Sequence, residues 1–180
     1  MRRVINYTNM SLDGVIELME RWHFDYVDGE TDALVSELLS TSDAMVMGRR
    51  TYQGFAEVWP HETGAIADKL NAMRKYVASR TLAAAEWNNS TIISGDIAAE
   101  VKGLKDEDGG DIITWGIGPV AESLLSHGLM DVIHIAVHPV LAGVGGLDEL
   151  LFRPGNAARF ELSDHRVLGS GVVVLTYRPS

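Results

Sequence analysis

The stretch Ile112–Leu129, IITWGIGPVAESLLSHGL, decides the fold. Its first four residues are mostly β-branched or aromatic and predict a strand, which stops at Gly116. Pro119 suits the first position of a helix, because its ring fixes φ and it has no N–H to leave without a partner. The apolar residues that follow recur at helical spacing, and Gly128 supplies the stop. A strand, a glycine loop and a helix start indicate a phosphate site, although a plain tight turn has the same pattern.

Length and composition indicate a single globular domain that spans residues 1–180. Hydrophobic residues make up 46% of the chain and charged residues 22%, a balance typical of folded rather than disordered proteins. The formal net charge of −10 argues against nucleic acid as a partner, because no basic stripe stands out to neutralise its phosphates. The absence of cysteine excludes disulfides, thiol catalysis and thiolate metal sites.

The N-terminus and the apolar runs predict a cytoplasmic protein without membrane contact. Arg2 and Arg3 are not followed by the long apolar run of a signal peptide. No apolar stretch reaches the roughly 20 residues that a membrane-spanning helix needs.

Strands and helices alternate through the first two-thirds of the chain, which predicts an α/β fold with a largely parallel sheet. The predicted strands cover residues 4–7, 44–47, 76–78, 91–93, 112–115, 130–137, 160–162 and 172–177. Thr31 and Asp96 are the predicted caps of two helices. Segment 17–30 has no clean period and is predicted to be a covering loop, and Lys105–Gly110 a solvated turn. The last strands are joined without a helix, so the C-terminal edge of the sheet is expected to be antiparallel.

Polar or glycine-containing segments follow several of the predicted strands. They are Ser11–Gly14, Gly48–Thr51, Ser79–Thr81 and Gly116–Gly118. Ligands of open α/β sheets bind outside the carboxyl ends of the strands, where these segments would lie together. Arg49 with Thr51 suits a pyrophosphate, and Arg80 suits a terminal phosphate such as the 2′-phosphate of NADP. Each segment alone is also explained by helix caps and solvated arginines, but together they favour a phosphate ligand.

Several short motifs carry a resemblance to a known family. They are SLDG at 11–14, MGRRTYQGF at 47–55, VASRT at 77–81, WGIG at 115–118, GLMD at 128–131 and HPVLAG at 138–143. With them the chain, from about residue 2 to residue 179, resembles the dihydrofolate reductase-like superfamily. It most resembles the reductase domain of bacterial riboflavin biosynthesis, the RibD C-terminal family. The resemblance implies a three-layer fold with a mixed eight-stranded sheet, NADPH as hydride donor, and commonly a homodimer.

The resemblance also assigns cofactor-binding roles by position. Gly48, Arg49 and Thr51 would hold the cofactor phosphates. Ser79 and Arg80 would contact the adenosine 2′-phosphate, and Gly116, Ile117 and Gly118 would line the pyrophosphate and nicotinamide side. Folate reductases have a glycine in place of Ile117 and a cis peptide bond there, and the sequence leaves open whether Gly116–Ile117 is cis.

Asp32 is the candidate catalytic residue, because it takes the place of the carboxylate that binds the pterin ring in dihydrofolate reductases. Hydride transfer to a C=N bond is easier when the nitrogen is protonated, and a carboxylate can organise that proton. An aspartate in the first turn of a helix also complements the helix dipole, so both roles stay open for Asp32.

Other side-chain patterns have less specific interpretations. His134 and His138 are four residues apart on a predicted strand, a span of about 13 Å, so they cannot bind one metal ion and no metal site is predicted. Trp22, Phe24 and Tyr26 alternate, which suits core or loop packing, or else the wall of a substrate pocket.

The predicted function is hydride transfer from NADPH to a small heteroaromatic substrate of pterin or aminopyrimidine type. The expected activity is similar to that of 5-amino-6-(5-phosphoribosylamino)uracil reductase of riboflavin biosynthesis. The alternatives are a dihydrofolate reductase proper, or a non-catalytic module that binds the nucleotide without turning it over.

Overall fold

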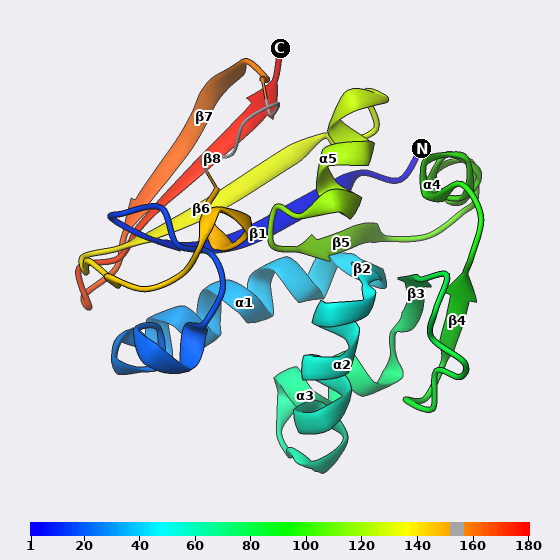
Figure 1. The fold of residues 1–180 in the computed structure, drawn as a ribbon, viewed down its shortest axis with the longest axis horizontal. Helices are drawn as coiled ribbons and strands as arrows, with labels where there is room; N and C mark the ends of the chain where they lie inside the picture. Colours follow the sequence, from blue (N-terminus) through cyan, green and yellow to red (C-terminus); the bar gives the residue numbers. More distant parts are fainter. Residues whose placement is uncertain (152–156) are drawn as a thin grey trace.

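The computed structural model describes residues 1–151 and 157–180, and its centre is one eight-stranded sheet (Figure 1). The strand order is β4-β3-β2-β5-β1-β6-β8-β7. The strands from β4 to β6 in this order are parallel, whereas β8 runs antiparallel to β6 and β7 antiparallel to β8. The predicted mixed sheet with an antiparallel C-terminal edge is therefore confirmed. The strands are β1 Val4–Ser11, β2 Ser42–Gly48, β3 Arg74–Ala78, β4 Ser90–Ile93, β5 Asp111–Trp115, β6 Val132–His138, β7 Phe160–Val167 and β8 Val173–Pro179.

Helices cover both faces of the sheet and make three layers. They are α1 Gly29–Thr41, α2 Arg49–Val58, α3 Ala65–Ala72, α4 Ile97–Asp106 and α5 Pro119–Ser126, with short 3-10 helices η1 Met19–Arg21, η2 Phe24–Tyr26, η3 Trp59–His61 and η4 Leu147–Glu149. Because side chains alternate along a strand, Met45 and Met47 join the core under α1, α2 and α3. Their neighbours Ala44 and Val46 join the core under α4 and α5. Figure 1 shows α1, α2 and α3 on one side of the sheet and α5 on the other.

The segment Gly116–Gly128 has the local structure that its residues predict. Gly116 has a φ of 72°, a left-handed conformation that glycine adopts without strain. Gly118 is the N-cap of α5, Pro119 is its first residue, and Gly128 follows its end with a φ of 65°. The peptide bond between Gly116 and Ile117 is trans.

Two local predictions need correction, one at the start of α1 and one at the first residue of the predicted solvated turn Lys105–Gly110, whose residues 106–109 are exposed as expected. The N-cap of α1 is Asp28 rather than Thr31, and its carboxylate accepts from the N–H groups of Glu30 and Thr31 at 3.0 and 2.9 Å. Lys105 belongs to α4 and is buried rather than solvated. Its ammonium group donates to Leu129 O at 3.0 Å and forms an ion pair with Asp131.

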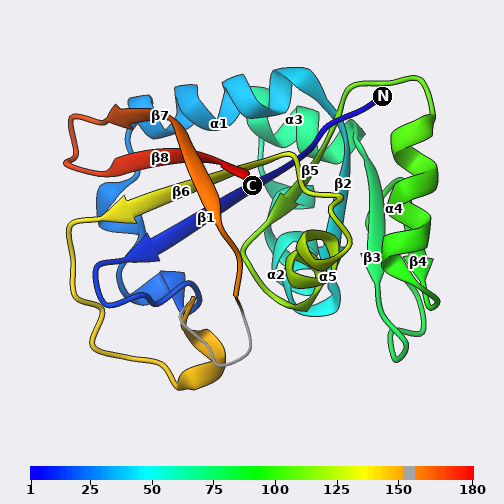
Figure 2. The ribbon, with the colours of Figure 1, turned by 90° about the horizontal axis from the view of Figure 1, so that it is seen from above.

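The segments after β1 and β6 lie side by side, as Figure 2 shows. The Asp13 carboxylate accepts from the N–H groups of Ala142 and Gly143 at 2.9 and 2.8 Å and from the Ser11 hydroxyl at 2.6 Å. These hydrogen bonds lower the pKa of Asp13 to about 2, with the Ser11 contribution the largest. Ser11–Gly14 therefore ties the loop after β1 to the loop after β6. The sequence had placed it among the phosphate-facing segments, and that prediction was wrong, because these residues do not line the cavity described below.

Strand β7 forms one edge of the sheet, and all of its residues are exposed, Leu162 and Val167 among them. The homodimer expected from the resemblance stays a prediction. Among the described residues, no helix has the length and apolar character needed to cross a membrane.

Candidate active site

A cavity of about 1300 Å³ opens at the carboxyl ends of β2, β3 and β5. The structure brings all the candidate residues into the wall of this one cavity: Asp32, Gly48, Arg49, Thr51, Ser79, Arg80, Gly116, Ile117 and Gly118. Single small-molecule sites usually measure about 300–1,000 Å³. The cavity therefore has room for two ligands, as a transfer reaction between a cofactor and a substrate requires.

Two helices point their N-termini at the cavity. Gly48 is the N-cap of α2 and Gly118 is the N-cap of α5, and neither supplies a side chain to the first N–H groups of its helix. A Cβ atom built on Gly118 would meet nothing within 4 Å, so packing inside the protein does not explain this glycine. Free N–H groups at two helix starts, approached over bare backbone, suit a pyrophosphate.

The loops after β2 and β3 supply the positive charge. Arg49 Nη1 donates to Thr81 Oγ1 at 2.7 Å, which ties the two loops together. Ser79 Oγ accepts from the N–H groups of Thr81 and Leu82 at 3.2 and 3.0 Å, and this turn presents Arg80 at the surface of the cavity. The hydroxyl hydrogen of Ser79 can still donate. The arrangement thus offers a guanidinium and a hydroxyl to one phosphate.

Carboxylates line the part of the cavity formed by η1, α1 and η4. Asp32 in α1 is exposed and lines the cavity, as do Glu20 in η1 and Asp148 in η4. Among the described residues of the wall, the arginines are confined to the β2–α2 and β3–β4 connections. The arginines of the wall therefore lie where phosphates are expected, whereas the carboxylates come from other elements and from Glu57 at the far end of α2.

The segment of residues 17–30 covers part of this cavity, as its lack of periodicity suggested. Its aromatic residues divide between the two interpretations given above. Trp22 is buried and packs edge-on against His138, with ring centroids 5.1 Å apart. Phe24 is 65% exposed and lines the cavity. Trp22 is thus a core residue, and Phe24 is a wall residue.

A pair of buried histidines was not visible in the sequence. His23 Nδ1 lies 2.9 Å from His138 Nε2, although the two residues are 115 positions apart. Burial, and then the charge of His138, lowers the pKa of His23 to about 4, and burial also lowers the pKa of His138. Sequence spacing could not reveal the pair, because η2 and β6 meet only in the folded chain.

The histidine pair predicts that the protein loses stability in mild acid. The unfolded chain protonates His23 near its ordinary pKa of 6.5, whereas the folded chain does so only near 4. Between these values the unfolded state binds more protons, so the free energy of unfolding should fall by about 2 kcal/mol as the pH drops from 6.5 to 4. Chemical denaturation at pH 7 and pH 4.5 measures this change.

The variants His23→Gln and His61→Gln isolate the contribution of the pair. His23→Gln should make the free energy of unfolding depend less on pH. Replacement of the exposed His61 should leave that dependence as in the parent protein. Equal slopes for the parent and His23→Gln would contradict the assignment of a neutral, buried His23.

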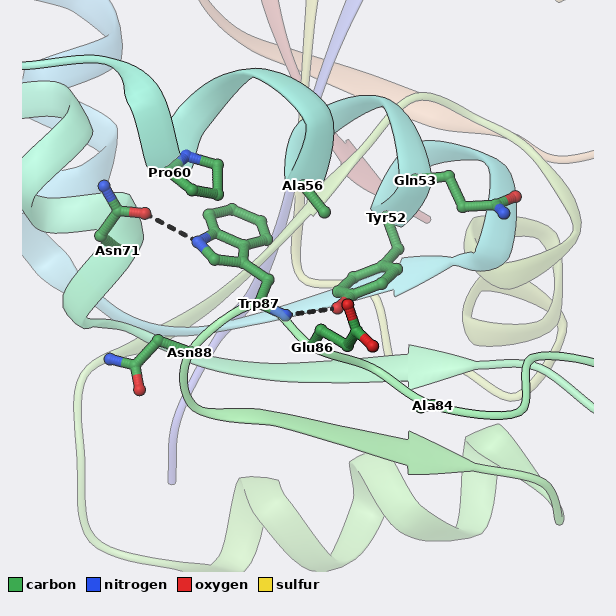
Figure 3. A pocket seen from close by; sticks show the side chains of 9 residues that line it. All are labelled: Tyr52, Gln53, Ala56, Pro60, Asn71, Ala84, Glu86, Trp87 and Asn88. Atoms are coloured by element: carbon green, nitrogen blue, oxygen red, sulfur yellow. Dashed lines mark hydrogen bonds between the residues drawn. The ribbon is translucent and has the colours of Figure 1, made fainter.

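A second hollow, of about 680 Å³, lies between α2 and the segment before β4, as Figure 3 shows. The backbone N–H of Trp87 donates to Tyr52 Oη at 2.9 Å, and the indole Nε1 of Trp87 donates to Asn71 Oδ1 at 2.7 Å. These polar groups are bonded to one another and tie the segment before β4 to α2 and α3. The hollow is therefore explained by internal structure and is not the candidate site.

Comparisons with known proteins agree with this fold. YyaP, an uncharacterized protein of Bacillus subtilis (strain 168), is 26% identical over 181 residues, which cover 98% of this chain and 94% of YyaP. A pyrimidine reductase-like protein from Corynebacterium diphtheriae NCTC has a similar structure, with a TM-score of 0.69 and 14% identity over 99% of this chain and 92% of that one.

A longer protein contains the same fold. This is the diaminohydroxyphosphoribosylaminopyrimidine deaminase/5-amino-6-(5-phosphoribosylamino)uracil reductase of Thermotoga maritima, with a TM-score of 0.67 and 15% identity over 99% of this chain. The alignment covers 57% of the Thermotoga chain, and at these identities the two structures are evidence for the fold alone. The sequence model of the RibD C-terminal domain matches residues 2–174, so the chain belongs to the RibD C-terminal domain family.

Proposed function

We propose that this chain is a reductase that transfers hydride from NADPH to a small heteroaromatic substrate of pterin or aminopyrimidine type. The observation that carries the proposal is the division of one cavity into two chemically different parts. Helix N-termini and arginines form the part suited to a dinucleotide. Asp32 and its neighbours form the part suited to a ring with protonated nitrogens. Membership of the RibD C-terminal family and the reductase named in the Thermotoga protein support this choice.

The residues of the cavity divide the work of the reaction. The first N–H groups of α2 and α5 would bind the pyrophosphate, and Arg80 with Ser79 would bind the 2′-phosphate. When bound, NADPH supplies the hydride. The Asp32 carboxylate would orient the substrate and hold a proton at the nitrogen bonded to the carbon that is reduced. The apolar wall, which includes Phe55 and Trp115, would exclude water from that carbon.

Direct binding and turnover test the proposal in two steps. NADPH, NADH and FMN are first titrated against the protein, and NADPH is expected to bind most tightly. NADPH oxidation is then followed with 5-amino-6-(5-phosphoribosylamino)uracil and with dihydrofolate. Turnover of dihydrofolate alone would favour the folate enzyme. Binding of NADPH without oxidation by any pyrimidine or pterin would favour the non-catalytic module. A preference for FMN would overturn the proposal.

Arg80→Ala is expected to weaken NADPH binding by about tenfold or more, because a charge-assisted bond to phosphate contributes about 1.5–3 kcal/mol. NADH has no 2′-phosphate, so its affinity should change less than about twofold. Calorimetric titration with both nucleotides measures the difference. Arg166→Ala is the matched control. Arg166 is an exposed arginine of β7 that forms an ion pair with Glu37 of α1 and does not line the cavity. Equal losses for NADPH and NADH would remove Arg80 from the 2′-phosphate site.

A further inference from the structure

Asn9 carries a buried polar atom that the protein itself does not satisfy. The residue lies on β1, is only 9% exposed, and lines the cavity. Among the described residues, its Oδ1 atom has no hydrogen-bond partner, and its Nδ2 atom makes only a 4.0 Å contact to the sulfur of Met19. Buried side-chain oxygens are nearly always hydrogen-bonded, and the exceptions call for an explanation. A donor on a bound ligand would provide one.

His23 lies close to Asn9 because of the sheet register. Asn9 pairs with Ala136 on β6, and His138 is the next residue of β6 on the same face. His23, the residue just before η2, contacts His138 and also lines the cavity. Asn9 and His23 therefore belong to one region of the wall, next to the loop that carries Phe24.

The hydrogen bonds of the pair determine which nitrogen of His23 carries a proton. His138 Nδ1 lies 3.0 Å from the Ala136 carbonyl oxygen, which can only accept, so this nitrogen must carry the hydrogen. His138 Nε2 is then an acceptor, and the hydrogen between the rings belongs to His23 Nδ1. A neutral His23 is left with an unprotonated Nε2 and its lone pair. Burial lowers the pKa of His23 to about 4, which keeps the ring neutral near pH 7.

Aromatic neighbours hold the pair in this geometry. Trp22 and Tyr26 pack edge-on against the His138 ring, with centroids 5.1 and 5.6 Å away. Phe24 lies beside His23 at 5.3 Å and exposes much of its ring. A flat heterocycle could pack on Phe24 while its edge meets the acceptors.

We propose that Asn9 and His23 determine substrate specificity, with His23 Nε2 and Asn9 Oδ1 accepting hydrogen bonds from N–H groups on the edge of a heterocycle. His138 is the positioning residue, because it fixes the tautomer of His23 and does not itself line the cavity. The inference rests on the proposed function only for the statement that this ligand is the compound reduced. The site selects heterocycles that carry amino groups or ring N–H groups, and it disfavours analogues of the same size without them.

Nitrogen-15 NMR of the imidazole rings tests the tautomer without any ligand. In the parent protein, His23 is expected to be protonated at Nδ1 and unprotonated at Nε2. His138→Gln removes the ring that imposes this state, and the signal of His23 should change toward the mixture of tautomers seen in free imidazoles. Protonation of His23 at Nε2 in the parent protein would overturn the proposal.

Two small probes test the selectivity. 2,4-Diaminopyrimidine carries donors on both substituents, and 2,4-dimethoxypyrimidine has the same ring without them. The parent protein is expected to bind the diamino compound at least tenfold more tightly. Asn9→Leu and His23→Phe should each reduce this preference to less than threefold. His134→Gln is the matched control, because His134 is another partly buried histidine of low pKa, bonded to Thr176 and outside the cavity wall.

The outcomes separate this inference from the proposed function. Equal or undetectable binding of the two pyrimidines by the parent protein would overturn the inference, whatever the result with NADPH. A preference that survives in both Asn9→Leu and His23→Phe would also overturn it. Loss of the preference in these variants, with NADPH affinity unchanged, supports the inference. Selective binding of the diamino compound by a protein that does not bind NADPH would leave the subsite in place and reject the reductase.

Discussion

Replacement of Lys75 by methionine is expected to lower the free energy of unfolding by about 4 kcal/mol, because it leaves three carbonyl groups around a buried position without their donor. Lys75 is fully buried on β3. Its ammonium group donates to the carbonyl oxygens of Asn71, Met73 and Asn88 at 3.1, 2.8 and 2.9 Å. It also lies over the Trp87 ring, 4.2 Å from the centroid. Methionine has nearly the same length and keeps the packing, but it cannot donate to any of these carbonyls.

The charge state of Lys75 agrees with this role. Burial lowers its pKa to about 8, so the ammonium form still predominates at pH 7 and all three hydrogens are available. Chemical denaturation of Lys75→Met and of Lys102→Met measures the effect, since Lys102 is an exposed lysine of α4. A loss of less than about 1 kcal/mol for Lys75→Met would mean that water replaces the ammonium group at the carbonyls.

Short-range patterns predicted the parts of the fold that depend on short-range physics. The turn at Gly116, the helix start at Pro119 and the cap at Asp96 each depend on conformations available to one or two residues. The mixed sheet and the shared edge of its loops were expected from the alternation of strands and helices and from the family resemblance, whereas the order of the strands was not predicted. At the start of α1, Asp28 and Thr31 are both residue types that can cap a helix. The sequence pattern predicted Thr31, whereas Asp28 is the cap.

The polar interior was not predictable in the same way. Lys75 has the appearance of an exposed strand residue, because its three acceptors come from the end of α3, the segment after it and the turn before β4. Likewise, His23 and His138 become partners only when η2 packs on β6. A buried polar group is identified by its partners, and a single sequence contains no information about partners from distant segments. The cavity residues that came from loops after strands were found. Of the residues that face them from η1, η2 and the turn between, the sequence offered Phe24 as a possible wall residue but gave no sign of His23.

Asp32→Asn is expected to lower kcat by about 100-fold or more, because a positioned proton donor or acceptor usually contributes 10²–10⁴-fold to such a step. Asparagine has the same size and keeps hydrogen-bonding atoms in the cavity, but it cannot hold a proton for the substrate. NADPH affinity should stay the same, since Asp32 lies on α1, away from the two helix starts that face the phosphates. Single-turnover oxidation of NADPH with 5-amino-6-(5-phosphoribosylamino)uracil measures the chemical step.

The same variant separates the two roles that the sequence leaves open for Asp32. If the carboxylate only complements the dipole of α1, its loss should cost about 0.5 kcal/mol of stability and leave kcat unchanged. If it acts on the substrate, kcat should fall while stability changes by no more than that amount. Glu20→Gln and Asp148→Asn are the matched controls, because both carboxylates line the same cavity. A larger fall in kcat for Asp148→Asn than for Asp32→Asn would transfer the proton-holding role to η4. Because Asp32 has to act on the nitrogen bonded to the reduced carbon, its effect should also disappear with any substrate that is reduced at a carbon not bonded to nitrogen.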